Sequence, residues 1–274
     1  MTPRIIIGSD TIMEQPDMID RIPNYHSTFI TDPQFSQIYA FQVSGSASVC
    51  STALPDASVD FVFYRSADGR RGLRLIGPAH ALTSSYVDFT GDTEYFGVRL
   101  KPALPAYVQS ASTRELYGAI LELDAADAAP LIDRLFAADS LPAQLEIAQP
   151  LLARTLRGED SGKTAIVRYI MARLLQRRDV RVADLATDMG YSPYYINKMF
   201  HDYTGFRIAQ YRRLLRLHSV LNAYEPTRNT AQMPTQAELA LSLGFSDQAH
   251  MIREFRCFTG MTPREYWRTY YKAD

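Results

Sequence analysis

Two segments in the C-terminal part of the chain place hydrogen-bonding side chains at helical spacing. The outward face of the first expected helix carries a phenol, an amide and two basic groups: Tyr194, Asn197, Lys198 and His201. The second expected helix presents an amide and three basic groups: Gln248, His250, Arg253 and Arg256. An arginine can form two hydrogen bonds with the edge of guanine, and an asparagine can do the same with adenine. These residue types therefore suggest base recognition in the major groove of DNA.

To present these side chains to DNA, the first expected helix must pack its other face against the protein, and the chain must enter the helix at a fixed angle. The sequence contains residues suited to both. Apolar residues have the i, i+3, i+4, i+7 spacing of an amphipathic helix at Val182, Leu185, Ala186 and Met189. Gly190 then provides the left-handed residue that ends a helix. Ser192 is expected to cap the next helix, with Pro193 at its first position. The buried side of that helix is expected at Ile196, Met199, Phe200 and Tyr203.

The second segment follows the same plan. Thr235 and Glu238 have the spacing of a capping box at the start of a helix, and Gly244 is expected to make the turn. Ser246 is expected to cap the following helix. The buried side of that helix is expected at Met251, Phe255 and Phe258, with Ile252 beside them.

The two segments are copies of one supersecondary unit. The pattern Ala-acidic-Leu-Ala-x-x-(Met/Leu)-Gly-aromatic-Ser occupies residues 183–192 and recurs 54 positions later at residues 237–246. A single amphipathic helix pair with a glycine turn more often reflects plain packing. Two copies with matching caps favour DNA binding. For Lys198 and Arg253, a solvated surface charge is the alternative to a DNA contact.

The two units and their spacing resemble the DNA-binding domain of the AraC/XylS family of transcription regulators, over about two fifths of the chain. In the first unit the resemblance is carried by Leu185-Ala186, residues 190–193, Phe200, Thr204-Gly205, Tyr211 and Arg216-Leu217. In the second unit it is carried by Leu239-Ala240, residues 244–248, Phe255, residues 259–263 and Tyr266. It implies a sequence-specific DNA-binding transcription regulator, more often an activator than a repressor.

The resemblance also implies which residues contact DNA. The base-reading positions are Tyr194, Asn197 and Lys198 in the first unit and Gln248, Ala249, His250 and Arg253 in the second. Phosphate contacts are expected from four basic residues: His201, Arg212, Arg216 and Arg256. The chain departs from the family pattern at Ala249, where a polar side chain is usual. The connection over residues 222–235 is also longer than usual, so the helix that joins the units is expected to end near Tyr224.

The N-terminal half is predicted to consist of short strands separated by turns, as in a β-sandwich or barrel. Strands are expected over four segments: residues 35–43, 59–64, 72–76 and 95–100. Asp68-Gly69 is typical of a hairpin turn between two of them. Residues 59–63 and 97–102 weakly resemble a cupin-like sensor domain of the same family. Helices are expected at residues 130–137 and 143–156, with Pro150 forcing a break or a new helix start.

Tyr95 and Arg99 are the candidates for binding a small-molecule effector. Arg99 lies across its strand from an apolar face and is suited to an anionic ligand, whereas a solvated strand charge is the alternative. The histidines of this half lack the close spacing of a metal site, so we expect neither a metal nor a cofactor. Cys50 and Cys257 are expected to be buried, reduced thiols.

The composition fits a globular protein of two domains. The chain has 274 residues, of which 46% are hydrophobic and 22% charged. Residues 163–274 carry 17 Lys+Arg and 10 Asp+Glu, so the acidic excess lies in the other half. This asymmetry is typical of a nucleic-acid-binding domain fused to another domain. Apolar runs are too short for a membrane span and no export signal is evident, so we expect a cytoplasmic protein without membrane contact.

We therefore predict an α+β protein with an N-terminal cupin-like β-barrel or sandwich and a C-terminal all-α domain with two helix-turn-helix units. The predicted segments are a β-rich effector or dimerisation domain at 1–125, a helical connector and linker at 126–162, and a DNA-binding domain at 163–274, with units at about 181–203 and 235–258. The expected partners are double-stranded DNA, a second copy of the chain, an effector and, for an activator, RNA polymerase. The rival hypothesis is an enzyme with a catalytic barrel and a helical appendage. A third is an N-terminal half that only dimerises.

Overall fold

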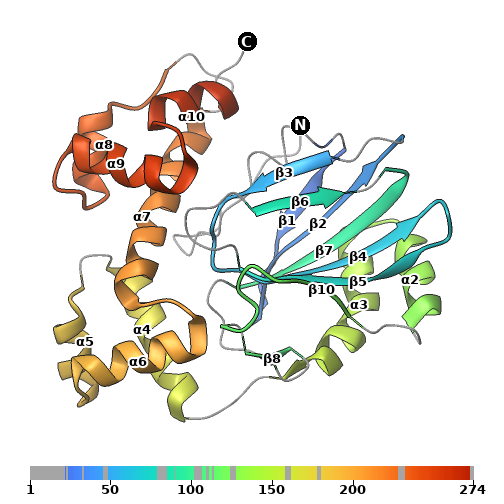
Figure 1. Ribbon diagram of the computed structural model, residues 1–274, viewed down its shortest axis with the longest axis horizontal. Coiled ribbons are helices and arrows are strands. Elements are labelled where there is room, and N and C mark those ends of the chain that lie inside the picture. Colours follow the sequence, from blue (N-terminus) through green and yellow to red (C-terminus); the bar gives the residue numbers. More distant parts are fainter. Residues whose placement is uncertain are drawn as a thin grey trace.

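The protein consists of a β-rich N-terminal part and a helical C-terminal part that lie side by side (Figure 1). This arrangement confirms the predicted fold class. The computed structural model describes residues 22, 24–32, 34–45, 49–78, 85–89, 91–101, 107–108, 111–112, 114–123, 128–157, 162–177, 180–227 and 232–271. Among these residues, no helix is both long enough and apolar enough to cross a membrane.

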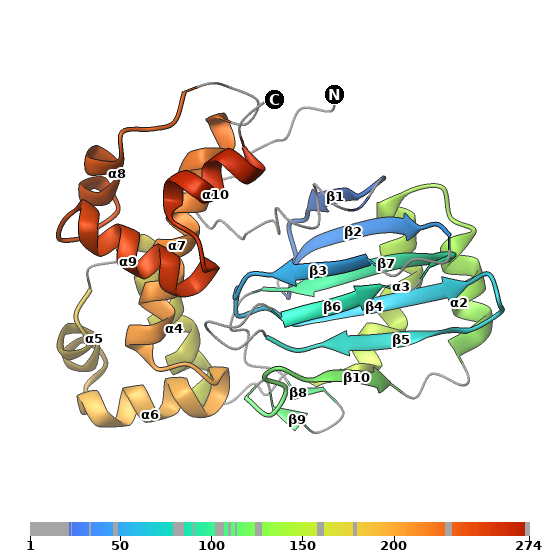
Figure 2. The same cartoon turned by 45° about the horizontal axis from the view of Figure 1, so that its top comes forward.

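A six-stranded antiparallel sheet is the centre of the N-terminal part (Figure 2). Its strands, in spatial order, are β1 (His26–Phe29), β2 (Phe35–Val43), β7 (Thr93–Leu100), β4 (Asp60–Ser66), β5 (Arg71–Ile76) and β10 (Ile120–Leu123). The β4–β5 turn has Gly69 at φ +90°, and a carboxylate oxygen of Asp68 accepts a hydrogen bond from the backbone N–H of Arg70 at 3.0 Å. The predicted hairpin is therefore present, and its turn uses the positive φ that glycine favours.

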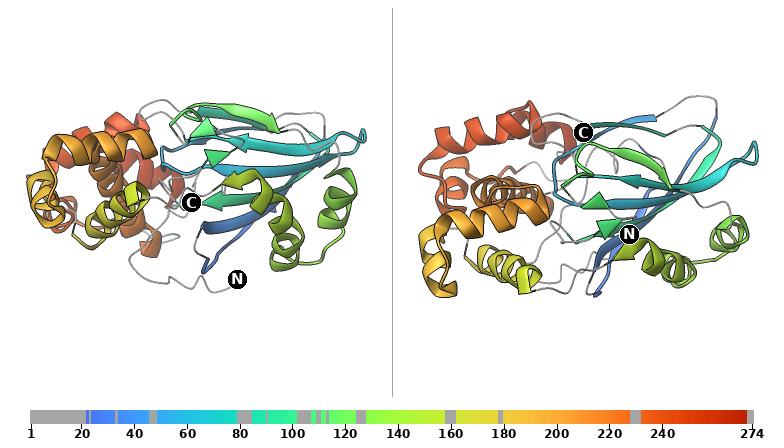
Figure 3. Two further views of the ribbon diagram at one scale, coloured as in Figure 1. Left: turned by 90° about the horizontal axis from the view of Figure 1, so that it is seen from below. Right: turned by 60° about the horizontal axis from the view of Figure 1, so that its bottom comes forward.

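Both faces of this sheet are covered, which is why most residues of its central strands, and not only every second one, are buried. One face packs its phenylalanines, such as Phe61 and Phe96, against helices α2 (Ala129–Phe136) and α3 (Leu141–Thr155), which lie together on that side in Figure 3. The other face packs Tyr39, Phe41 and Tyr95 against the two-stranded sheet β3 (Val49–Ala53) and β6 (Ser85–Phe89). A small three-stranded sheet combines β8 (Tyr107–Val108), β9 (Ala111–Ser112) and β11 (Leu156–Arg157).

The predicted break at Pro150 is wrong, because α3 continues through this residue without interruption. Pro150 lies on the exposed side of the helix, while Ala148, Leu151 and Leu152 next to it are buried against the sheet. A proline in a helix interior removes one backbone hydrogen bond and crowds the preceding turn. Here the buried residues on both sides of Pro150 anchor the helix and offset that local cost.

The C-terminal part is entirely helical among its described residues. It contains α4 (Gly162–Gln176), α5 (Val182–Met189), α6 (Pro193–Thr204), α7 (Ile208–Tyr224), the 3-10 turn η2 (Glu225–Thr227), α8 (Gln236–Ser242), α9 (Gln248–Thr259) and α10 (Pro263–Tyr270). Helix α7 passes through the middle of this part, with α5 and α6 beside one end and α8 and α9 beside the other (Figure 1). It ends at Tyr224, as predicted from the sequence.

Three further predictions concern the two cysteines, the linker and the domain boundaries. Cys257 is exposed, so its predicted burial is wrong, whereas the side chain of Cys50 lies outside the described residues. The predicted linker at residues 157–162 falls largely on residues 158–161, which are also outside them. The predicted domain boundaries stay a prediction. The structure shows only that α2 and α3 pack on the sheet and share its core.

Candidate DNA-binding surface

The first helix-turn-helix unit is formed by α5 and α6, and its turn has the predicted local structure. Gly190 ends α5 in the left-handed conformation, with φ +70°. The hydroxyl of Ser192 accepts a hydrogen bond from the backbone N–H of Tyr195 at 3.2 Å, and Pro193 is the first residue of α6. These two features fix the angle at which the chain enters the second helix.

Helix α6 has the predicted buried face and a polar outward face. Ile196, Met199 and Phe200 are buried, as predicted, whereas Tyr203 is only partly buried. On the outward face Tyr194 is 77% exposed, the largest exposure among the large hydrophobic residues of the described chain. Lys198 is also exposed and forms an ion pair with Asp202, one turn later on the same helix. Two other candidates on this helix, Asn197 and His201, are partly buried.

The second unit, α8 and α9, repeats the fold of the first but differs in its caps. Gly244 makes the turn with φ +78°, as predicted. The cap of α9 is Asp247, not Ser246: a carboxylate oxygen of Asp247 accepts a hydrogen bond from the backbone N–H of His250 at 2.6 Å. The capping box predicted at Thr235 is also wrong, because its side chain makes no capping hydrogen bond within the described part of the chain.

A reciprocal capping box is found instead two helices later, at the start of α10. The hydroxyl of Thr262 accepts from the backbone N–H of Glu265, and the Glu265 carboxylate accepts from the backbone N–H of Thr262 at 2.7 Å. Both sites have a threonine followed three residues later by glutamate. The motif alone therefore does not determine which one forms the reciprocal bonds, and the backbones of the two threonines differ, with ψ 118° at Thr235 and 156° at Thr262.

Helix α9 also presents an outward face with the predicted side chains. Met251, Phe255 and Phe258 are buried, as expected. Four candidates are exposed: Gln248, Ala249, Arg253 and Arg256. One ring nitrogen of His250 is already engaged within the protein. Its Nδ1 accepts a hydrogen bond from the backbone N–H of Ser246 at 3.3 Å and lies 3.0 Å from the Ser246 hydroxyl.

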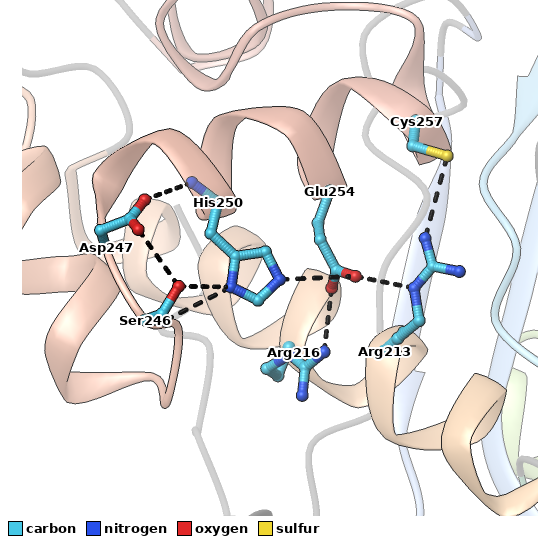
Figure 4. A network of polar contacts seen from close by, with 7 residues as sticks. All are labelled: Arg213, Arg216, Ser246, Asp247, His250, Glu254 and Cys257. Carbon is cyan, nitrogen blue, oxygen red and sulfur yellow. Dashed lines mark hydrogen bonds and ion pairs between the residues drawn. The ribbon is translucent and has the colours of Figure 1, made fainter.

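A carboxylate that the sequence analysis missed lies between α9 and α7. Glu254 accepts hydrogen bonds from Arg213 at 2.7 Å and from Arg216 at 3.0 Å, both on α7 (Figure 4). The Arg216 side chain is only 13% exposed and its guanidinium lies over the ring of Phe245. Arg216, predicted to contact phosphate, is therefore engaged inside the domain, and Arg212 is partly buried. In the sequence, the only sign of this cluster is the four-residue spacing of His250 and Glu254, which places both side chains on one face of a helix.

The two units occupy equivalent positions on α7. In Figures 1 and 2, α6 and α9 cross α7 in a similar direction, one near each end of it. The second helix of each unit, α6 and α9, is called its recognition helix below. Each ends in a glycine with a left-handed backbone, Gly205 after α6 and Gly260 after α9. Hence the repeat in the sequence is also a repeat of the local structure around a shared central helix.

Comparison with known proteins agrees with this geometry. A family model for a helix-turn-helix domain, of the AraC type, matches residues 171–269. The probable transcription factor PqrA of Proteus vulgaris is 24% identical over 101 residues, which are 37% of this chain and 79% of PqrA. Residues 171–269 therefore form a helix-turn-helix domain of the AraC type, which confirms the resemblance inferred from the sequence.

Two solved structures are also similar to this chain. The C-terminal domain of AraT, a response regulator from Geobacillus stearothermophilus, is 21% identical, and the match covers 42% of this chain and 93% of AraT with a TM-score of 0.35. ToxT from Vibrio cholerae is 9% identical, and the match covers 90% of this chain and 98% of ToxT with a TM-score of 0.46.

Inside the β-rich part, Arg99 is buried rather than solvated. Its guanidinium is 3.0 Å from Asp60 and 3.3 Å from Asp56, and the hydroxyl of Tyr39 donates a hydrogen bond to Asp60 at 3.1 Å. Burial raises the pKa of Asp60, although Arg99 opposes this shift. The alternative of a solvated strand charge is therefore wrong, and the charge of Arg99 is already balanced by two carboxylates.

Gln37 lies opposite Arg99 on the neighbouring strand β2. Its side chain is fully buried, and neither polar atom of its amide has a hydrogen-bond partner among the described residues. The other candidate, Tyr95, is buried on the same side of the sheet, where its ring stacks on Phe41 at 4.9 Å and meets Phe89 edge-on at 5.1 Å. The structure thus places Gln37 and Arg99 next to each other and Tyr95 in an aromatic core.

The polar cluster around Arg99 is linked to the helical domain through residues 54–57, the segment that contains Asp56. Pro55, which precedes Asp56, has its carbonyl oxygen 2.6 Å from Nε2 of His218 on α7. Leu54 and Ala57 from the same loop are part of the hydrophobic core of the helical domain. Because a buried carbonyl needs a donor, His218 must carry its proton on Nε2 here.

A second contact joins the β-rich part to the end of recognition helix α6. The ring of Tyr117 meets Phe206 edge-on at 5.0 Å, and a Cβ atom at Gly205 would lie only 2.2 Å from the Tyr117 ring. Arg114 lies 3.5 Å from Asp202, the residue that also pairs with Lys198. The N-terminal part therefore contacts Asp202 of the first unit, whose carboxylate also pairs with Lys198, a candidate base-reading residue.

The buried His218 predicts a dependence of stability on pH. Burial lowers the pKa of His218 to about 4 from its usual 6.5. Between these values the unfolded chain binds a proton that the folded chain does not, so stability falls as the pH is lowered through this window. We expect the free energy of unfolding to be about 2 kcal/mol lower at pH 5 than at pH 7 through this group.

Urea denaturation followed by fluorescence of Trp267, the only tryptophan and a buried residue of the helical domain, measures this difference. The His218→Gln variant keeps an N–H donor for Pro55 but has no titrating group, so this part of the pH dependence should disappear. The matched control is His26→Gln in exposed β1, which should behave as the wild type. An unchanged pH dependence in His218→Gln would contradict the assignment.

Proposed function

We propose that the protein regulates transcription by placing α6 and α9 in successive major grooves of one DNA duplex, and that it performs no catalytic step. The observation that supports this most is the repetition of two exposed recognition helices on one central helix. A helix fits the major groove of B-DNA, where each base pair presents a distinct set of donors and acceptors. The rival hypothesis of an enzyme receives no comparable support.

We propose six of the candidates as base-contacting residues: Tyr194, Asn197, Lys198, Gln248, Ala249 and Arg253. Arg253 is exposed and can bond guanine at two acceptors, and Asn197 can do the same for adenine. Lys198 can exchange its ion pair with Asp202 for a base or a phosphate. Ala249 offers only a methyl group, which suits contact with thymine.

Phosphate contacts are proposed for His201, Arg212 and Arg256, which lie on or next to the recognition helices. Arg216 was predicted to join them, but its pairing with Glu254 and its low exposure favour a role inside the domain. Contacts of this kind neutralise backbone charge and carry no sequence information by themselves. Affinity for all sequences should therefore fall steeply with rising salt.

Base reading by the two helices is tested by Arg253→Ala and Asn197→Ala. Each variant should lose about 1–3 kcal/mol of binding free energy at the preferred site and relax the preference at one base pair. Because Ala249 lacks a polar group, Asn197→Ala should cause the larger loss of discrimination. The measurement is titration of a panel of single-base operator variants.

The matched control for Arg253→Ala is Arg268→Ala, an exposed arginine of α10 that lies outside the recognition helices. It removes the same charge from the same domain and should leave all base preferences unchanged. Base preferences that stay unchanged in both test variants would overturn the assignment of the recognition helices. A larger loss for Arg253→Ala would reverse the order of the two units.

We propose further that the protein is a cytoplasmic activator that works as a homodimer and contacts RNA polymerase. Two copies joined through their N-terminal parts would read two sites with a high effective concentration. The full-length chain should therefore sediment as a dimer at micromolar concentration, and residues 163–274 alone as a monomer that still binds DNA. A monomeric full-length chain, with and without DNA, would refute this proposal.

We propose that the β-rich part senses a small molecule near Gln37 and Arg99. The balanced charge of Arg99 favours a neutral, hydrogen-bonding ligand over the anionic ligand expected from the sequence. A buried amide without partners costs about 1–3 kcal/mol, and a ligand that satisfies Gln37 would recover this energy. An N-terminal part that only dimerises is the alternative.

Replacement of Gln37 by leucine tests this proposal. Gln37→Leu should raise the free energy of unfolding by about 1–3 kcal/mol, because it removes the unsatisfied amide. The control is Gln42→Leu near the end of the same strand, where the side chain is exposed, and it should leave stability nearly unchanged. In a thermal-shift screen of neutral and anionic metabolites, a ligand should stabilise the wild type but not Gln37→Leu. A less stable Gln37→Leu variant would count against an unsatisfied amide.

A further inference from the structure

The connection between α9 and α7 depends on one carboxylate. Glu254, with a side chain only 14% exposed, binds Arg213 through one oxygen and Arg216 through the other, at 2.7 and 3.0 Å. The two arginines are three residues apart and therefore lie on one face of α7. Figure 4 shows the carboxylate between the two helices, with an arginine on either side of it.

Each arginine is itself held against the second unit. The guanidinium of Arg213 lies 5.3 Å above the ring of Phe258, and that of Arg216 lies 5.4 Å above the ring of Phe245. Burial would raise the pKa of Glu254, but its hydrogen bonds and ion pairs with the two arginines hold this pKa below its ordinary value. The carboxylate is therefore charged at neutral pH, and the bonds have a fixed geometry on both sides.

The same carboxylate also faces a predicted base-reading residue. Nε2 of His250 lies 3.8 Å from Glu254, and Nδ1 is bonded to Ser246, so both ring nitrogens are directed along α9 and its turn (Figure 4). With Nδ1 as an acceptor from the Ser246 backbone, the neutral ring carries its proton on Nε2, toward Glu254. His250 thus belongs to a chain of contacts that runs from the α8–α9 turn to α7.

We propose that Glu254 is a positioning residue that fixes the orientation of α9 on α7 and thereby sets the separation between the DNA sub-sites of the two units. This inference rests on the proposed reading of DNA by both α6 and α9. The first unit lies near the other end of α7, so rotation of α9 about its contact with α7 changes the distance and angle between the two recognition helices. His250 then orients the second unit through Glu254 instead of reading a base.

The test uses the full-length protein and duplexes that it selects from random-sequence DNA. Asn197→Ala and Arg253→Ala first identify the base pairs read by each unit. One base pair is then inserted between these two sub-sites, which displaces one of them by about 3.4 Å and turns it by about 35°. The readout is the ratio of the affinities for the original and the lengthened duplex.

For the wild type this ratio should be on the order of tenfold or more, because a rigid protein loses the contacts of one unit. Glu254→Gln keeps the shape of the side chain but removes the charge that both arginines bind. Its ratio should fall to about threefold or less, because α9 can adjust to the longer site. A mere loss of folded protein lowers the affinity for both duplexes equally and leaves the ratio unchanged.

Two further variants complete the design. Glu238→Gln removes an exposed carboxylate from α8 of the same unit and should keep the wild-type ratio, which controls for the change in net charge. Arg213→Gln weakens the cluster from the side of α7, where the arginine is 39% exposed, and should give an intermediate ratio. Arg213→Gln decides the question if Glu254→Gln does not fold, as judged by Trp267 fluorescence.

A wild-type ratio in both Glu254→Gln and Arg213→Gln would overturn the inference while leaving DNA reading intact. A wild-type protein that tolerates the inserted base pair would overturn it as well. Failure of Asn197→Ala and Arg253→Ala to identify any sub-site would instead contradict the proposed function itself. The two proposals therefore fail in distinguishable ways.

Discussion

The structure of the C-terminal half depends on the burial of α7 along most of its length. Residues that face in different directions from this helix, such as Leu215, Val220 and Leu221, are all buried, because both helix-turn-helix units and a loop of the β-rich part pack around it. A helix that is apolar on one stripe only can serve a single partner, whereas one that is buried all round organises several. The positions of α6 and α9 follow from this constraint.

Burial on all sides restricts the polar residues of α7 to those that find partners. Ser219 donates a hydrogen bond to the carbonyl of Leu215 at 2.6 Å, and His218 bonds to Pro55 across the domain boundary. Arg213 and Arg216 lie where α7 meets the second unit and are paired with Glu254. The polar side chains of this helix therefore mark its contacts, one with the β-rich part and one with α9.

The local structure of the two units could be predicted from the sequence because it depends on neighbouring residues. Gly190, Ser192 and Pro193 act within one turn of chain, and the apolar stripes need only a helical period. The cap at Asp247 was missed by one residue, since serine and aspartate are adjacent and both are good caps. In such a case only the backbone angles of the two residues determine which one accepts the hydrogen bond.

The remaining features could not be predicted because they join residues that are distant in the sequence. Glu254 pairs with arginines about forty residues away, and Arg99 pairs with Asp56 and Asp60 through the packing of separate strands. A single sequence shows a charge but not its partner. The sequence therefore left two interpretations of Arg99 open, a ligand contact or a solvated charge. The structure excludes the solvated charge, because Arg99 is buried and paired with two carboxylates.

The contact of Tyr117 with Gly205 bears on how far the two halves can be exchanged between relatives. Any residue with a Cβ atom at position 205 would collide with the Tyr117 ring, and the left-handed backbone there disfavours such a residue in any case. A chimera that joins this helical half to a foreign sensor would keep the glycine but lose the tyrosine and the loop that covers α7. The apolar surface of α7 would then be open to water. Recombination of this regulator therefore has to transfer the docking segments together with the domain that they cover.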